Sequence, residues 1–112
     1  MTGDEFREIA LSFPETEERS HMNHPDFRVG GKIFATLGPD EDWGMAKLKP
    51  EQQEVYLRTE QASFKPAAGA WGAGGATIIT LAAADEDAVR RALNDAWQNI
   101  APPKIAKLYG IS

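Results

Sequence analysis

Apolar positions near the N-terminus recur with helical spacing. They fall at i, i+3, i+4 and i+7 and so share one helix face: Phe6, Ile9, Ala10 and Phe13. Thr2 and Glu5 have the spacing of a capping box, and Pro14 favours the end of the helix at the residue before it. The pattern predicts an amphipathic helix over residues 2–13.

A longer helical pattern lies near the C-terminus. Asp85 is suited to cap its first turn, and the two acidic residues that follow complement the helix dipole. The apolar face comprises Ala88, Val89, Ala92, Leu93, Ala96, Trp97 and Ile100. Two consecutive prolines then end the pattern. We predict a helix over residues 85–100 and a short helical turn over residues 104–110, ending at Gly110.

The segment between these helices has short apolar runs separated by turn residues. Residues 17–49 are typical of an antiparallel β-meander, and the β-branched run at 76–83 indicates the most buried strand. A proline begins a short predicted helix at 50–60. The residues expected to face inward from it are Val55, Tyr56 and Thr59. Residues 63–75 are rich in glycine, alanine and proline, and no regular element is assigned to them.

A series of mainly antiparallel strands with a helix at each end favours a two-layer α+β sandwich, in which both helices lie on one face of the sheet. The 112 residues suffice for one core, so we expect a single domain over residues 1–112. The two long helices should be adjacent and should bury their apolar residues against Ile78 or Ile79.

The stretch "PDFRVGGKIFATLG" at 25–38 allows two interpretations. A phosphate-binding loop needs a helix and a Ser or Thr directly after its lysine, but Lys32 is followed by the strand-like "IFATL". A hairpin with Gly30 and Gly31 as its turn fits better, because glycine tolerates positive φ. That turn pairs Val29 with Lys32, Arg28 with Ile33 and Phe27 with Phe34. A three-residue loop would pair Val29 with Ile33 instead, and the sequence leaves both registers open.

Composition narrows the class of protein. Apolar residues make up 42% and charged residues 26%, as in ordinary globular proteins rather than disordered ones. The absence of cysteine excludes disulfides, thiolate metal sites and cysteine nucleophiles. No apolar run approaches the ~20 residues that a membrane span needs. We expect a monomeric, bacterial-type cytoplasmic protein.

Several stretches together resemble the MmcQ/YjbR family of small bacterial proteins. They are "FPETEERSHMNHPDFRVGGKIFATL", "AKLKPEQQEVYL", "SFKPAAGAWGAGGATIITL" and "LNDAWQNIAPPK", and the resemblance runs from about Phe6 to Lys107. It implies a frataxin-like (CyaY-like) fold with two helices on one face of an antiparallel sheet. The family is often labelled DNA-binding, so DNA or another anionic partner is the partner that the resemblance implies.

The sheet face away from the helices is where basic residues should gather to bind such a partner. The candidates are Arg28, Lys32, Lys47, Lys49, Lys65 and Lys104, with Trp71 as a surface on which a base could stack. Basic groups interleaved with aromatic rings on an open sheet are typical of single-strand binding. The alternative is that these charges only solvate the surface, since the net charge of −5 opposes phosphate binding.

Two metal hypotheses and an enzymatic one are weaker. His21 and His24 are residues that hold transition metals, but a spacing of three places them on opposite faces of a strand unless "NHPD" forms a turn. The fold resemblance to frataxins suggests weak iron binding along the acidic N-terminal segment, at Asp4, Glu8, Glu15, Glu17 and Glu18. No nucleophile motif or carboxylate pair indicates an enzyme. We therefore expect a non-enzymatic domain without metal or cofactor; a protein-interaction module is the alternative function.

Overall fold

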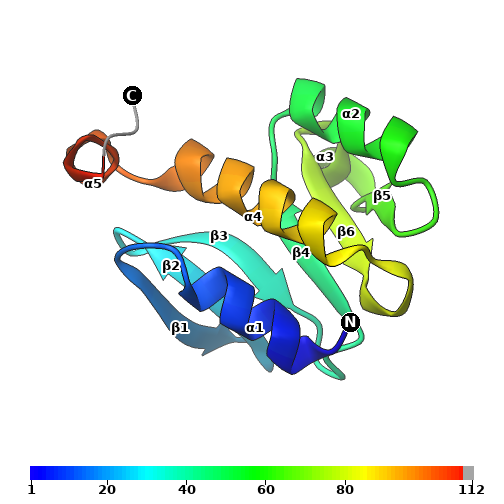
Figure 1. The fold of residues 1–112 in the computed structure, drawn as a ribbon, viewed down its shortest axis with the longest axis horizontal. Helices are drawn as coiled ribbons and strands as arrows, with labels where there is room; N and C mark the ends of the chain where they lie inside the picture. Colours follow the sequence, from blue (N-terminus) through cyan, green and yellow to red (C-terminus); the bar gives the residue numbers. More distant parts are fainter. Residues whose placement is uncertain (110–112) are drawn as a thin grey trace.

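The computed structural model describes residues 1–109, and the predicted helix end at Gly110 lies outside them (Figure 1). Its elements are, in order, α1 (Gly3–Leu11), β1 (Thr16–His21), β2 (His24–Val29), β3 (Lys32–Leu37), β4 (Trp43–Lys47), α2 (Pro50–Thr59), β5 (Phe64–Pro66), α3 (Gly69–Ala73), β6 (Ala76–Thr80), a 3-10 turn (Leu81–Ala83), α4 (Glu86–Ile100) and α5 (Pro103–Leu108). No helix within residues 1–109 is long and apolar enough to cross a membrane.

The strands form one antiparallel sheet in the order β1-β2-β3-β4-β6-β5. Figure 1 shows α1 and α4 side by side on the same side of this sheet. The predicted two-layer α+β sandwich is therefore confirmed. The sheet face opposite α1 and α4 is called the open face below.

Helix α1 forms as its sequence predicts but is shorter. Thr2 Oγ1 accepts a hydrogen bond from the Glu5 amide at 3.1 Å, and Glu5 returns one to the Thr2 amide at 2.9 Å, completing the capping box. The helix ends at Leu11, two residues before its predicted end. Phe13 lies beyond it yet still contributes to the core, because its ring packs edge-on against Phe34 with centroids 6.3 Å apart.

Helix α4 supplies most of the helical layer. Asp85 caps it by accepting a hydrogen bond from the Ala88 amide at 3.0 Å, as predicted. Trp97 has no exposed surface, and its indole Nε1 donates to the Pro14 carbonyl at 3.0 Å. Of the two isoleucines expected beneath the helices, Ile79 is fully buried in the core, whereas Ile78 lies on the other face of the sheet.

The Gly30–Gly31 hairpin has the predicted two-residue turn. Both glycines have positive φ, +61° and +79°, and the strand that follows excludes a phosphate loop. Two of the three predicted pairs are present, Val29 with Lys32 and Arg28 with Ile33. The third is wrong, because the register shifts between Phe27 and Arg28 and Phe27 pairs with Ala35 instead of Phe34.

This bulge has a clear packing reason. The extra residue in β3 lets two consecutive residues, Phe34 and Ala35, both be fully buried. Phe27 is also fully buried and packs against Phe6 with ring centroids 6.1 Å apart. Simple alternation would allow only every second residue of β3 to reach the core. The bulge therefore adds Ala35 and Leu37 to the core side of β3 and leaves Thr36 opposite Asp26 on the other face.

The segment at 63–75 contains two short elements that the sequence did not indicate, β5 and α3. A distant side chain anchors this region. Gln53 of α2 is buried, and its amide nitrogen lies 3.1 Å from the carbonyl oxygens of Gly72 and Ala76 and from Thr77 Oγ1. Local composition therefore could not reveal what holds α3 in place.

Helix α2 faces the core with a different side from the one predicted. Tyr56 is buried as expected, and its hydroxyl donates to Asp95 of α4 at 2.8 Å. Burial, together with this bond, raises the pKa of Tyr56 above its usual value. Val55 and Thr59 are exposed, so the inward orientation predicted for them was wrong. Gln53 occupies the inward position instead because it satisfies buried carbonyls.

Replacing Trp97 with alanine should reduce the free energy of unfolding by about 3–5 kcal/mol, because it empties a core position and leaves the Pro14 carbonyl without its donor. Urea unfolding measures this effect. Trp71, 67% exposed, is the matched control, and its replacement by alanine should change stability by less than about 0.5 kcal/mol. Equal effects at the two positions would contradict the layer assignment.

The two turn glycines should respond differently to asparagine, which tolerates positive φ. A Cβ at Gly31 meets nothing within 4 Å, so Gly31→Asn should be nearly neutral. A Cβ at Gly30 would overlap the ring of Pro102, so Gly30→Asn should cost about 1–3 kcal/mol. Thermal unfolding of both variants checks this, and a larger loss at Gly31 would refute it.

Candidate functional site on the open face

Strand register determines which side chains share the open face. Directly paired residues on neighbouring antiparallel strands point to the same side of a sheet. One row of such pairs crosses all the strands and comprises Arg19, Asp26, Thr36, Met45, Ile78 and Lys65. The open face is therefore charged toward its two ends and apolar in the middle.

Asp26 is the fully buried carboxylate of this row. Its Oδ1 accepts from Arg28 Nε at 2.8 Å, and its Oδ2 accepts from Arg28 Nη2 at 3.1 Å and from His21 Nδ1 at 2.7 Å. The hydrogen bonds from Arg28, and secondarily from His21, hold the pKa of Asp26 below its usual value despite burial. The Asp26 carboxylate in turn raises the pKa of Arg28. The charge of Arg28 is thus matched within the protein.

His21 and His24 face the same side of the sheet because a tight turn separates them. Met22 and Asn23 form this turn with positive φ of 47° and 66°, and the two histidines become cross-strand partners. Their rings stack with centroids 5.7 Å apart and planes 19° from parallel. Stacked rings do not converge on an ion, and residues 1–109 hold no group of three or more His, Asp or Glu suited to a metal.

Trp71 projects from α3 beside two lysines. The Lys47 ammonium lies 5.9 Å from the centroid of the Trp71 ring, and Trp71 remains 67% exposed. Lys47, Lys49 and Trp71 line a shallow hollow of about 380 Å³ at the edge of the open face, where Asn99 and Ile100 of α4 also border it. An exposed flat ring next to two cations can accept a planar group and a negative charge at the same time.

Two further hollows continue along the open face. Trp71 also borders one of about 230 Å³ that is lined by Trp43, His21 and His24. Trp43 in turn borders one of about 540 Å³ that contains Lys65. Because neighbouring hollows share a tryptophan, they form a continuous track from Lys47 to Lys65.

The predicted site residues therefore divide into groups. Lys47, Lys49 and Trp71 lie together, and Lys65 lies farther along the same track. Arg28 is on the open face, but its guanidinium is bound to Asp26.

Lys32 and Lys104 lie elsewhere. Lys32 pairs with the core residue Val29, so its side chain leaves the sheet on the same side as the helices. It lies at the end of β3 that adjoins the Gly30–Gly31 turn. Lys104 is in α5, directly after the prolines that meet this hairpin at Gly30. Neither lysine is among the residues that line the three hollows of the track.

Sequence reasoning missed the role of His21 and His24 in shaping the open face. The sequence indicated them only as metal ligands, which a turn at "NHPD" would have to bring to one side of a strand. Asn23 was the available signal for the turn between them, because asparagine adopts positive φ more readily than most residues. Met22 gave no such signal.

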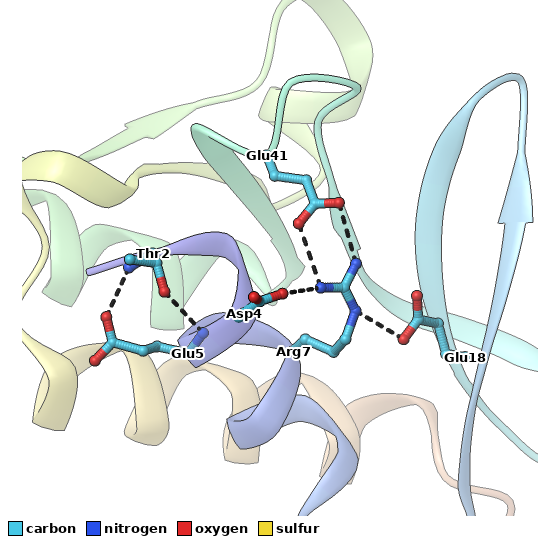
Figure 2. A network of polar contacts seen from close by, with 6 residues as sticks. All are labelled: Thr2, Asp4, Glu5, Arg7, Glu18 and Glu41. Carbon is cyan, nitrogen blue, oxygen red and sulfur yellow. Dashed lines mark hydrogen bonds and ion pairs between the residues drawn. The ribbon is translucent and has the colours of Figure 1, made fainter.

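Part of the acidic N-terminal segment is engaged in ion pairs. Figure 2 shows Arg7 of α1 between Asp4 of its own helix, Glu18 of β1 and Glu41 of the β3–β4 loop, at 2.6, 2.9 and 3.1 Å. The hydrogen bond to Glu41 contributes most to raising the pKa of Arg7. Arg7 therefore ties α1 to β1 and to the β3–β4 loop.

Comparisons with known proteins agree with this architecture. No curated protein matches the chain. The crystal structure of Deinococcus radiodurans protein DR2400, of domain family DUF419, is similar with a TM-score of 0.77 and 17% sequence identity. The match covers 99% of this chain and 89% of that one and shows a common fold. The YjbR family model matches residues 11–99, and the chain therefore belongs to the YjbR family.

Proposed function

We propose that this protein is a non-enzymatic domain that binds single-stranded nucleic acid along the track on its open face. The observation that carries the proposal is the exposed Trp71 ring with the Lys47 ammonium 5.9 Å from its centroid and Lys49 in the same hollow. Aromatic rings stack on bases of any sequence, and lysines neutralise the phosphates between them.

The distribution of charge supports a local site. The chain carries a net charge of −5, and residues 1–20 contain six acidic residues against two basic ones. Several of those carboxylates are paired with Arg7 or Arg19. Lys47 and Lys49 have no such carboxylate among the residues that line their hollow. Their charge is available to an anion, although the overall field favours only weak binding.

The non-enzymatic part of the proposal rests on how the polar groups of the face are used. His21, Asp26 and Arg28 bind one another, and Asp26 is fully buried. Such a network fixes side chains in place, which suits a binding surface. A protein-interaction module, which would use the same exposed tryptophan, is the alternative to nucleic-acid binding.

Changing both Lys47 and Lys49 to glutamate should weaken binding of single-stranded DNA strongly, because two phosphate contacts are replaced by repulsion. Binding is best measured by fluorescence anisotropy with labelled oligonucleotides at about 50 and 200 mM salt, where counterion release makes several contacts visible. Wild-type affinity should fall steeply with salt, and the dependence should be shallower in the variant by about one unit of log–log slope for each lost contact.

The matched control changes Lys32 and Lys104 to glutamate, which alters the net charge equally but away from the track. This control should retain most of the wild-type affinity. Equal losses in the two double variants would indicate a general charge effect. No binding of single- or double-stranded DNA at low salt would refute the proposal and favour the protein-interaction module.

A further inference from the structure

The middle hollow of the track, of about 230 Å³, has aromatic walls and an apolar floor. Trp43 and Trp71 border it, and Met45 and Ile78 form neighbouring floor positions as direct cross-strand partners. Met45 is only 7% exposed. A flat apolar group therefore fits this hollow better than a phosphate does.

Trp43 is held in position before any ligand arrives. A Cβ at Gly38 would overlap the indole ring, so Trp43 packs directly over the backbone there. On another side the His24 ring meets Trp43 edge-on, with centroids 5.7 Å apart and planes at 65°. A ring fixed in this way loses little conformational freedom when a planar ligand stacks on it.

His21 supplies a directional polar group to the same hollow. An ionised carboxylate can only accept hydrogen bonds, so the bond between Asp26 and His21 requires that Nδ1 of the histidine carry a hydrogen. Nε2 is then the nitrogen left for a ligand, and in the neutral ring it accepts. Thr36, whose side chain both donates and accepts, also lines the hollow.

We propose that this hollow takes one unstacked base of a bound strand, with its ring against Trp43 and an N–H group donated to His21 Nε2. Flat heteroaromatic rings with hydrogen-bonding edges are the chemical class that such walls and such an edge recognise. Trp71 separates this hollow from the one that contains Lys47, so the adjoining phosphate meets Lys47. The inference rests on the proposed function and adds a contact to the base itself.

The test compares two probes with the whole protein at about 50 mM salt. One is a short single-stranded thymidine oligonucleotide, and the other has the same length and phosphates but abasic sites. Loss of a stacked base weakens binding by about 5- to 150-fold, so the thymidine probe should bind more tightly by a factor in this range. Phosphate contacts alone would give equal affinities.

Two substitutions of Trp43 locate the base contact. Trp43→Leu should lower the affinity for the thymidine probe toward that for the abasic probe and leave abasic binding unchanged, whereas Trp43→Phe should retain most of the difference. Met22→Ala is the control, since Met22 is 88% exposed, adjoins His21 in sequence and does not line the hollow. Thermal unfolding of each variant confirms that it is folded. If Trp43→Leu is not, the indole N–H signal of Trp43 in a ¹H–¹⁵N spectrum of the wild type replaces it: the signal should shift with the thymidine probe and stay fixed with the abasic probe, and equal shifts would overturn the base site.

The outcomes separate this inference from the proposed function. If both probes bind equally, or Trp43→Leu weakens both alike, the base site is overturned and phosphate binding through Lys47 and Lys49 stands. If neither probe binds, the proposed function fails and the base site fails with it.

Discussion

Trp97 is enclosed by the helical layer and the sheet, and its indole N–H donates to the Pro14 carbonyl at the end of the N-terminal helical segment. This contact joins α4 to the turn that follows α1 and holds both helices on a single side of the sheet. With α1 and α4 on that side, the apolar side chains of the central strands are divided between a sealed core and a face that stays open. The strand residues of the track, among them Trp43 and Lys47 of β4, are accessible because of this asymmetry, whereas Trp71 reaches the track from α3.

The open face is itself organised around a buried charge. An isolated carboxylate in the position of Asp26 would be costly, and three hydrogen bonds from His21 and Arg28 offset that cost. The arrangement fixes the orientation of His21 at the middle hollow but uses the charge of Arg28. The positive charge of the track therefore comes from Lys47, Lys49 and Lys65, and a count of basic residues in the sequence overstates it.

The sequence predicted the elements with strong periodicity and the hairpin with two adjacent glycines, because these depend on local spacing and backbone freedom. It did not predict the bulge at Phe34, since that depends on how much room the helices leave.

The site was partly predictable. Lys47, Lys49 and Trp71 gather as expected, whereas the Asp26–Arg28 pair and the turn that brings His21 beside His24 depend on strand pairing. The sequence did not predict helix α3, because a hydrogen bond from the side-chain amide of Gln53, which is distant in the chain, holds this helix in place.

We propose that the open face, and not the helical layer, is the binding surface. The protein's 3 tryptophans report on it directly, since Trp43 and Trp71 line the track and Trp97 is buried beneath the helices. The decisive measurement is a two-dimensional ¹H–¹⁵N NMR titration of their indole N–H signals with single-stranded DNA at low salt. Binding on the open face should shift the signals of Trp43 and Trp71 and leave that of Trp97 fixed. Shifts confined to Trp97 and to amides of α1 and α4 would contradict it.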